Sequence, residues 1–329
     1  MKITKPHYYD QFSCIAGDCP DSCCHEWEVA VDDAAAALYH SLPGTLGDRI
    51  RQKLKTGDDG WYLEITEGRC PMWRDDGLCE IQHQLGHDAL CQTCRDFPRL
   101  RHDYGDFVEL GLELSCPEAA RIILTAPDAP DVTEEACDGE EPDYDPDTMA
   151  VLLATRETAL SILRRHDIPT ALGLLLVYGS HAQADVDAGE VTEFDEDGAL
   201  AMLAQLELPA PVPLTDFYAG LEVLTQRWAA LLRSPSPLTH WPEEIRAMAR
   251  CQVSRYWLQA VSDWDLVPRV KMIVASCILV RQLGGNPIAT AQLYSKEIDN
   301  SADNVEAVLD AAYTAPALTD RNLLSCLIR

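Results

Sequence analysis

The residues with the greatest capacity for chemistry are the cysteines, and most of them gather in the first third of the chain. Nine of the thirteen lie between Cys14 and Cys116. The first four fall within eleven residues, among Gly17, Pro20 and small polar residues that favour turns over helix. A later Cys-x-x-Cys turn can present two sulfurs to one metal ion. The sequence therefore predicts a metal site whose candidate ligands are Cys14, Cys19, Cys23, Cys24, Cys70, Cys79, Cys91, Cys94 and Cys116.

The number of thiols leaves the kind of metal site open. Two four-thiolate sites would use eight of the nine sulfurs, whereas one four-iron cluster would use three or four and leave the others structural. Zinc binds four thiolates tetrahedrally and serves structure, while an iron–sulfur cluster adds redox or Lewis-acid chemistry. His83 and His87 would share one face if residues 80–89 form a helix. The histidines that could replace a sulfur are His25, His83, His87 and His102.

The start of the chain and its apolar runs predict a cytoplasmic protein that does not enter a membrane. Residues 1–9 carry charge but no following apolar stretch of the kind that a signal peptide needs. The longest apolar runs, 171–178 and 272–280, are much shorter than the roughly 20 residues that span a bilayer. A reducing compartment keeps thiols free, which favours metal ligation over disulfides. Four scattered cysteines are expected to be packing residues instead, namely Cys137, Cys251, Cys277 and Cys326.

The charge of the chain narrows its possible partners. Acidic residues number 54 against 26 basic ones, which gives a formal net charge of −28. DNA or RNA would be repelled by most of such a surface, so no nucleic-acid partner is expected. A cationic partner, such as a lysine-bearing protein or a sulfonium compound, would be attracted. A generally solvated acidic surface explains the same composition without any partner.

The elements that position the cysteines are expected to form a separate domain. Residues 126–147 are rich in Pro, Asp and Glu, with no Lys or Arg between Arg121 and Arg156, which is typical of an exposed linker. We expect a cysteine-rich metal- or iron–sulfur-binding domain of loops and short helices at residues 1–125. The acidic linker at 126–147 would join it to a helical domain at 148–329. The predicted fold class is mainly α, with a helical bundle as the C-terminal domain.

Beyond the linker, apolar residues recur mainly at helical spacing. Pro169 suits a first helical turn, Thr215 and Ser301 are plausible N-caps, and Gly284 with Gly285 can end a helix. The stretch between residues 182 and 215 carries no motif. The expected helices cover residues 149–166, 169–182, 215–233, 242–262 and 266–283, with two shorter ones near the end of the chain.

Motifs for calcium and nucleotide binding are not supported. Residues 185–190 superficially resemble a calcium loop, but the glycine stands at the fifth position rather than the sixth, and the oxygen ligand of that position is missing. An acidic loop between helices explains this stretch better. The sequence contains no Gly-x-Gly-x-x-Gly or phosphate-binding loop and no alternating strand–helix units. A classical nucleotide-binding sheet therefore has no support.

The order of the cysteine motifs resembles that of the flagellin lysine-N-methylase family. The likeness covers the cysteines between residues 14 and 24, Cys-Pro at 70–71, Gly-Leu-Cys at 77–79, Cys-x-x-Cys-Arg-x-Phe-Pro-Arg at 91–99, and Leu-Ser-Cys-Pro-Glu-Ala-Ala-Arg at 114–121. It continues weakly in Arg255-Tyr256-Trp257, residues 265–275 and the acidic stretch 301–313. The cysteines also resemble a broader family of CxxCxxCC-type zinc- or iron-chelating proteins, which limits what they alone indicate about function.

The resemblance implies an enzyme that transfers methyl groups from S-adenosylmethionine to lysine side chains of flagellin. It also implies an associated iron–sulfur cluster, expected to be 4Fe-4S, with zinc as the alternative. A lysine of reference pKa about 10.4 must lose its proton before its nitrogen can attack the sulfonium methyl, and a desolvated aromatic cleft would promote that loss. Tyr178, His181 and Tyr256, with Trp257, are the candidates for such a cleft. For each of them core packing is the simpler interpretation.

Two other functions fit the same residues. A zinc- or iron–sulfur-stapled scaffold could bind a basic protein partner without chemistry, because a site closed by four thiolates leaves no open coordination position. An electron-transfer protein would need a cluster but no cofactor pocket. The identity of the metal would separate these functions in part.

Overall fold

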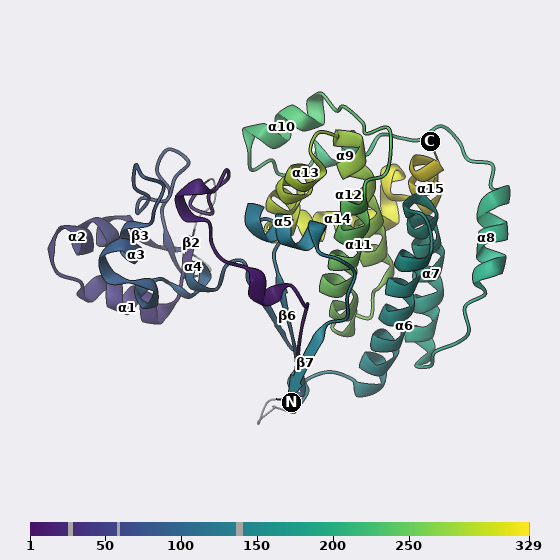
Figure 1. Cartoon of the computed structure of the whole chain (residues 1–329), viewed down its shortest axis with the longest axis horizontal. Helices are drawn as coiled ribbons and strands as arrows, with labels where there is room; N and C mark the ends of the chain where they lie inside the picture. The colour runs from purple at the N-terminus through teal and green to yellow at the C-terminus, as the bar shows by residue number, and fades with distance from the viewer. Residues whose placement is uncertain (26–28, 58–59, 136–140, 329) are drawn as a thin grey trace.

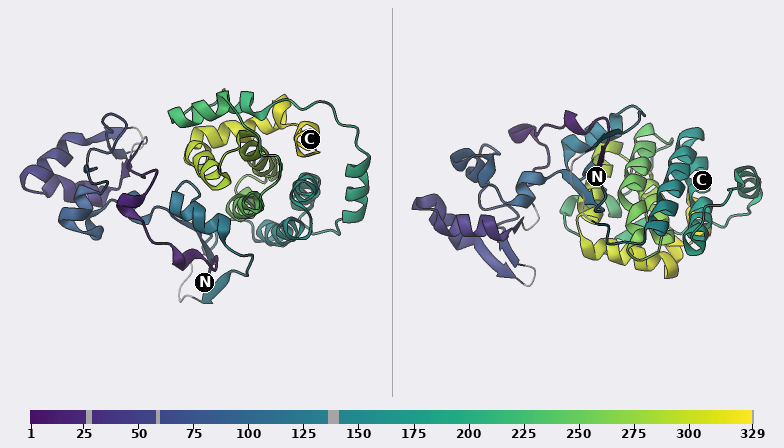
Figure 2. Two further views of the ribbon diagram at one scale, coloured as in Figure 1. Left: turned by 45° about the horizontal axis from the view of Figure 1, so that its top comes forward. Right: turned by 90° about the horizontal axis from the view of Figure 1, so that it is seen from below.

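The computed structural model describes residues 1–25, 29–57, 60–135 and 141–328. A small cysteine-rich lobe stands beside a larger helical body, and strands of a mixed sheet lie between them (Figure 1). Turning the molecule keeps the two parts side by side (Figure 2). None of the helices in these ranges is long and apolar enough to cross a membrane.

The small lobe combines short helices with an antiparallel sheet around the buried side chains of Tyr39, Ile50 and Met72. Asp32 joins two of its helices, because one carboxylate oxygen accepts a hydrogen bond from the Ala35 N–H at 3.0 Å and the other from the Gln92 N–H at 2.7 Å. The sheet has the strand order β2-β4-β3. Its elements are β2 (Val29–Val31), α1 (Asp33–Ser41), α2 (Gly44–Lys53), β3 (Leu54–Gly57), β4 (Gly60–Leu63), α3 (Glu80–Leu85) and α4 (Gln92–Asp96).

The mixed sheet brings together strands that are far apart in the chain, in the order β5-β6-β1-β7. Strand β1 (Lys2–Lys5) runs parallel to β6 (Phe107–Leu112), with Lys2 opposite Phe107. Strands β5 (Arg99–Asp103) and β7 (Val132–Glu135) pair antiparallel to β6 and β1, respectively. The sequence predicted loops and short helices for this region, so the two sheets correct that part of the expected fold.

The helical body forms around α12 (Val267–Leu283), whose side chains are apolar on nearly every face and almost all buried. A helix of this kind must be surrounded by others, and α12 packs against α7, α11, α13, α14 and α15. The mainly α character predicted from the sequence is therefore confirmed. The remaining helices are α5 (Pro117–Thr125), α6 (Pro146–Arg165), α7 (Ile168–Ala188), α8 (Glu196–Gln205), α9 (Leu214–Tyr218), α10 (Gln226–Arg233), α11 (Glu243–Tyr256), α13 (Pro287–Tyr294), α14 (Ala302–Thr314) and α15 (Asp320–Ile328).

Local start and stop signals located several of these helices correctly. Pro169 lies in the first turn of α7, and Gly284, at a φ of 74°, ends α12. The Ser301 side chain accepts a hydrogen bond from the Asn304 N–H and caps α14. These signals succeed because each acts within one helical turn of the residue that carries it.

The single helix predicted for residues 215–233 is wrong. The structure has α9 ending at Tyr218 and α10 beginning at Gln226, with Thr225 rather than Thr215 as a cap. Between the two helices, the Leu224 N–H donates to a carboxylate oxygen of Glu297 at 2.8 Å. This buried contact, from a residue 73 positions away, holds an extended connection that local periodicity cannot reveal. Helix α8 lies between residues 182 and 215, the stretch that carries no recognisable motif.

The described residues bury two separate hydrophobic cores. The smaller core runs from Val29 to Cys91, and the larger takes in Leu112, the apolar face of α5 and the helices that follow. Strand β7 lies inside the acidic stretch 126–147. The division of the chain into domains at that stretch stays a prediction.

A buried ion pair fastens the mixed sheet to the helical body. Both terminal nitrogens of Arg156 in α6 donate to the two carboxylate oxygens of Glu109 in β6, at 2.7 and 2.6 Å. The side chains are only 11% and 16% exposed. Removing one partner of such a pair leaves an uncompensated charge in a poorly solvated place, which costs more than losing a surface ion pair.

Replacing the acid of this pair should therefore destabilise the fold. We expect Glu109→Gln to lower the free energy of unfolding by about 3 kcal/mol, because the charge of Arg156 would stay buried without its counter-ion. Urea unfolding measures the change. Glu118→Gln is the matched control: its partner Arg121 is 57% exposed, so a loss below about 1 kcal/mol is expected. Equal losses in the two variants would contradict the role of burial.

Candidate functional site

The predicted cysteine ligands occupy loops and helix starts of the small lobe and its border with the body. Cys14 and Cys19 flank a short 3-10 turn, Ala16–Asp18, and Cys23 and Cys24 follow it. Three others are N-cap residues of short helices, and burial raises the pKa of two of them, Cys79 and Cys116. These three are Cys79 at α3, Cys91 at α4 and Cys116 at α5.

Several of these thiols form hydrogen bonds with one another. Hydrogen bonds from the Cys23 and Cys70 thiols hold the pKa of Cys24 well below its usual value. The Cys94 thiol likewise donates to Cys91 and lowers the pKa of that thiol. The charge of the Cys24 thiolate also acts on Cys94, so both sets of thiols lie in one region. One sulfur in each set thus favours the thiolate form that metals bind.

The donor set suits a thiophilic metal or an iron–sulfur cluster by its chemistry, since its groups are thiols with two of them favoured as thiolates. Within the described ranges, no three or more side chains of Cys, His, Asp or Glu converge in an arrangement that could hold a metal ion. The thiols meet as hydrogen-bonded neighbours instead. Metal ligation by the nine cysteines therefore stays a prediction.

The substitute ligands and the scattered cysteines have other surroundings. The His25 ring packs edge-on against Trp73, with ring centroids 4.0 Å apart. The condition for His83 and His87 to share one helix face is not met, because α3 ends at Leu85 and Gly86 follows at a φ of 87°. Cys277 and Cys326 are buried, as expected of packing residues, and Cys251 is half-buried. Cys137 lies outside the described residues.

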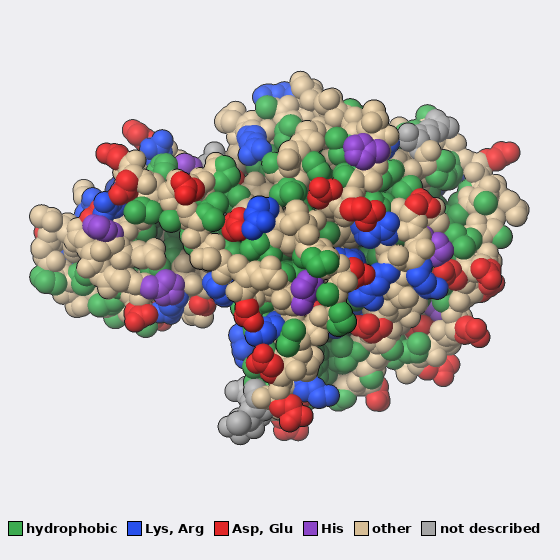
Figure 3. Space-filling view, viewed as in Figure 1, with side chains coloured by type: hydrophobic (Ala, Val, Ile, Leu, Met, Phe, Trp, Pro, Cys, Tyr) green, Lys and Arg blue, Asp and Glu red, His purple; other side chains and the backbone are tan. Residues whose placement is uncertain are grey.

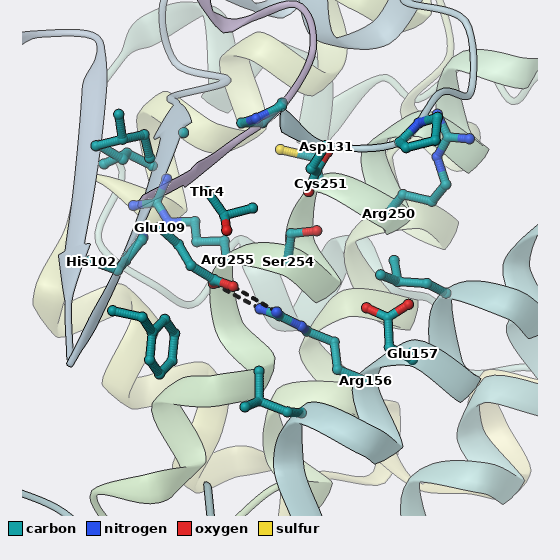
Figure 4. Close-up of a pocket in the computed structure, with 18 of the residues that line it drawn as sticks. Thr4, His102, Glu109, Asp131, Arg156, Glu157, Arg250, Cys251, Ser254 and Arg255 are labelled. Carbon is teal, nitrogen blue, oxygen red and sulfur yellow. Dashed lines mark hydrogen bonds and ion pairs between the residues drawn. The ribbon is translucent and has the colours of Figure 1, made fainter. Parts of the chain in front are cut away.

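A pocket of about 1060 Å³ opens where the mixed sheet meets α6 and α11 (Figure 4). Its walls come from β1, β5, β6 and residues 127–131 as well as from the two helices. Small-molecule sites usually measure about 300 to 1,000 Å³, so this one has room for more than one reactant group. It is the best candidate for a reaction site in the described part of the chain.

Arginines gather in this pocket although the chain is strongly acidic. Arg156 is neutralised by Glu109, which also lines the pocket. Arg164 and Arg250 share the carboxylate of Asp128, at 3.1 and 2.8 Å. These three cations are therefore bound by two acids of the pocket wall itself, Glu109 and Asp128.

Arg255 differs from the other arginines of the pocket. Its terminal nitrogen lies 3.2 Å from a carboxylate oxygen of Glu113, but Glu113 is not part of the pocket wall. The guanidinium also lies over the ring of Tyr256, 5.3 Å from the centroid. Arg255 therefore lies in the pocket wall, while its counter-ion, Glu113, lies outside that wall.

Burial shifts the pKa of two side chains that line the pocket, His102 and Asp131. Burial lowers the pKa of His102, and the nearby Arg255 charge lowers it further, so the imidazole is neutral near pH 7. His102 stands opposite Glu109 in the β5–β6 register. Burial also raises the pKa of Asp131. A neutral imidazole beside several cations can accept a proton from a bound ammonium group.

The three catalytic candidates of the sequence lie elsewhere. The Tyr178 ring stacks on Trp257 and His181, with centroids 6.2 and 5.9 Å apart, and burial raises its pKa to about 12. The Tyr256 hydroxyl donates to Asp299 at 2.8 Å. The structure brings Tyr178, His181 and Trp257 together, and none of these residues or Tyr256 lines the pocket. Their catalytic role stays a prediction.

Sequence reasoning missed the pocket because its walls come from segments far apart in the chain. His102 was considered only as a metal ligand, and Arg255 only as part of a weak motif. The one available signal was the presence of basic residues, such as Arg156 and Arg250, in a chain of net charge −28. Position in the chain gave no indication that they meet.

The curated proteins similar to this chain are named as lysine-N-methylases or as a flagellar biosynthetic protein. The chain is 31% identical over 218 residues to the Lysine-N-methylase of Salmonella typhimurium, which covers 63% of this chain and 54% of that relative. The Lysine-N-methylase of Salmonella choleraesuis gives the same identity and coverage. The Flagellar biosynthetic protein FliU of Salmonella muenchen is 35% identical over 136 residues, 39% of this chain and 80% of that relative.

The extent of these matches limits what they imply. The chain spans about half the length of the lysine-N-methylases it matches. No family model and no solved structure matches it. The match to FliU, however, covers most of that relative, and the cysteine motifs follow the order of the same family. On this basis the chain belongs to the flagellin lysine-N-methylase family.

Proposed function

We propose that this chain methylates lysine side chains of flagellin with S-adenosylmethionine as the methyl donor. The names of the lysine-N-methylases and of FliU support the reaction and the flagellar substrate. Because the chain spans only part of the lysine-N-methylases, these names do not show that it contains a reaction site. The proposal therefore also needs a pocket in this chain that can hold the reactants.

The observation that carries the proposal is the pocket between the sheet and the helices. Its volume of about 1060 Å³ allows a nucleoside-sized donor and an inserted lysine side chain to be present together. Its walls carry both signs of charge, with Arg255 and Glu157 among them. S-adenosylmethionine is a zwitterion with a sulfonium group, so both signs of charge have a use in binding it.

The lysine nitrogen must be neutral before it reacts. Removal from water lowers the pKa of an ammonium group placed in the pocket, and the guanidinium of Arg255 in the pocket wall acts in the same direction. The neutral His102 imidazole is the proton acceptor that we assign, since it lines the same wall. The acidic exterior attracts a lysine-bearing protein, whereas the pocket favours the uncharged amine.

The transfer itself is a displacement at carbon. The lone pair of the lysine nitrogen forms the new N–CH₃ bond as the S–CH₃ bond breaks, and the electron pair of that bond stays on sulfur. The lysine proton leaves to a ring nitrogen of His102, and S-adenosylhomocysteine is released. The chain contributes orientation of the two reactants and exclusion of water, which together lower the barrier.

The N-terminal cysteines belong to the same proposal as ligands of an iron–sulfur cluster. Thiols of Cys23, Cys24 and Cys70, and of Cys91 and Cys94, are already neighbours. When bound, such a cluster would cross-link these segments and supply redox or Lewis-acid chemistry. In this proposal the cysteines stabilise the lobe, and no step of methyl transfer passes through them.

Methyl transfer can be tested with one substitution that fills the pocket. The chain purified without oxygen should transfer label from methyl-labelled S-adenosylmethionine to flagellin lysines, as identified by peptide mass spectrometry. Ser254 is exposed on α11 and lines the pocket, so Ser254→Trp should reduce the rate about 100-fold by displacing the reactants. Ser262→Trp, exposed outside the pocket, should retain the rate. No transfer by the unmodified chain would refute the activity.

The role assigned to His102 gives a pH dependence. Its folded-state pKa lies below the reference value of about 6.5, so the proton acceptor is lost only as the pH falls through that lower value. We expect kcat/KM to decline on this acid limb, and His102→Gln to lower it about 100-fold and to remove the limb. His240→Gln, at an exposed histidine outside the pocket, is the control. An unchanged acid limb in His102→Gln would disprove the assignment.

The metal proposal is tested by removing single thiols. Cys23→Ser and Cys94→Ser should each lose metal and lower the unfolding temperature, because metal binding and folding are linked. Iron, zinc and acid-labile sulfide are measured on protein purified without oxygen. Cys326→Ser, which removes a buried thiol of α15, should keep its metal. Full metal content and unchanged melting in both variants would count against ligation, and zinc without iron would favour a structural scaffold.

A further inference from the structure

Arg255 stands at the end of a continuous chain of polar contacts that begins in the cysteine loop. From the pocket wall, its Nη2 reaches an oxygen of Glu113 at 3.2 Å. The other oxygen of Glu113 accepts a hydrogen bond from the Ser115 hydroxyl at 3.0 Å. The Ser115 carbonyl accepts one from the Gln292 amide at 2.8 Å, and the same amide donates to Asp21 at 2.8 Å.

Asp21 also leads back to the pocket wall by a second path. Its other carboxylate oxygen lies 2.8 Å from the ammonium of Lys296, in the π-helical turn Ser295–Asp299. Asp299, at the end of that turn, accepts the hydrogen bond of the Tyr256 hydroxyl at 2.8 Å. The Tyr256 ring packs against the guanidinium of Arg255. The contacts therefore close a ring that contains both the cysteine loop and the pocket wall.

The members of this ring are poorly exposed, which makes their contacts strong. Gln292 is 3% exposed and Lys296 is 9% exposed, while the side chains of Asp21 and Glu113 are 15% and 13% exposed. Charged hydrogen bonds in such surroundings are strengthened, and a group left without its partner is costly. A π-helical turn is also rare, and such turns occur frequently at functional sites. These contacts connect Asp21 to Arg255 through poorly exposed groups.

We propose that Arg255 binds the carboxylate of the amino-acid portion of S-adenosylmethionine, and that Asp21 orients Arg255 through this ring. This inference rests on the proposed function, because it deepens the assignment of the pocket to the methyl donor. Asp21 lies between Cys19 and Cys23, so the arrangement of the cysteine loop sets the affinity of the pocket for the donor. Arg255 is the binding residue, and Glu113, Gln292 and Asp21 are positioning residues.

The geometry favours a carboxylate over other ligand groups at this point. A guanidinium presents a planar fork of donors that matches a carboxylate, and Glu113 is bound to one terminal nitrogen of that fork. Arg156 is bound by Glu109 within the pocket wall, and Arg164 and Arg250 share Asp128 there, whereas the acid of Arg255 lies outside that wall. A ligand carboxylate at Arg255 therefore meets no acid of the pocket wall that is already bound to the same guanidinium.

The carboxylate assignment is tested by calorimetry with two ligands that cannot transfer a methyl group. S-adenosylhomocysteine carries the amino-acid portion, and 5′-methylthioadenosine lacks it. Arg255→Ala should weaken binding of the first about tenfold or more, as expected for a lost charged hydrogen bond. Binding of the second should change less than about twofold. Arg255→Lys keeps the charge but not the fork of donors. Its affinity for S-adenosylhomocysteine should therefore lie between that of the unmodified chain and that of Arg255→Ala.

The positioning role is tested with neutral replacements around the ring. Asp21→Asn and Gln292→Met should each weaken S-adenosylhomocysteine about threefold or more, the range expected for coupling through a packed network. Binding of 5′-methylthioadenosine should stay unchanged. Asp18→Asn is the matched control, because it removes the same charge from the same loop at an exposed side chain. Iron, sulfide and melting temperature are measured on every variant, and Gln292→Met leaves the cysteine loop itself intact.

The outcomes separate the inference from the function on which it rests. If the unmodified chain binds neither ligand, the assignment of the pocket to S-adenosylmethionine fails, and the inference fails with it. If that chain binds both ligands but Arg255→Ala loses them equally or not at all, the carboxylate assignment alone is overturned. Asp21→Asn and Gln292→Met that bind like Asp18→Asn would overturn the ring. The inference is supported if Arg255→Ala, Asp21→Asn and Gln292→Met each lose binding of S-adenosylhomocysteine selectively, with metal retained in Gln292→Met.

Discussion

The cost of burying arginine charges is the constraint on which the rest of this structure depends. Glu109 in β6 and Glu113, directly after it, neutralise Arg156 of α6 and Arg255 of α11. A poorly solvated cation is tolerated only with a close, well-oriented partner, so β6 must lie where its acids meet both helices. Pairing of β6 with β1 and β5 keeps it there. The sheet and the helices are thus joined by charges, and the pocket between them has charged groups among the apolar side chains of its wall.

This arrangement separates two electrostatic tasks in one acidic chain. On the face shown in Figure 3, acidic side chains are spread over both parts of the molecule, with basic ones among them. The net charge of −28 attracts a lysine-bearing protein at long range. Inside the pocket the two signs of charge balance, with Lys2, Arg156, Arg164, Arg250 and Arg255 against Asp106, Glu109, Asp128, Asp131 and Glu157. A lysine that moves from the exterior to the pocket leaves an acidic, solvated surface that favours its ammonium form, and its removal from water favours the neutral amine.

The sequence located features that depend on neighbouring residues and missed those that depend on distant ones. Pro169, Gly284 and Ser301 mark helix ends correctly, because each signal acts within a turn of the chain. The break between α9 and α10 depends on Glu297, and the parallel pairing of β1 with β6 joins residues about a hundred positions apart. The pocket follows from that pairing. Cysteine order indicated the family, but no periodicity could indicate that His102 and Arg255 face one space.

The size of the small lobe gives an argument for metal binding that does not depend on thiol chemistry. Its core is formed by a segment of about 60 residues, a length at which apolar burial alone gives marginal stability and small domains often use a disulfide or metal. Cys70 and Cys91 are part of that core, and Cys24 and Cys79 pack against it. A metal at these sulfurs would join four separate segments where the lobe most needs stabilisation, and its binding energy would be folding energy. The helical body, with its continuous core around α12, has no such need. A metal bound in the lobe would act on the pocket through the chain that continues from α4 into β5 and through contacts at the border, of which Asp21 makes two.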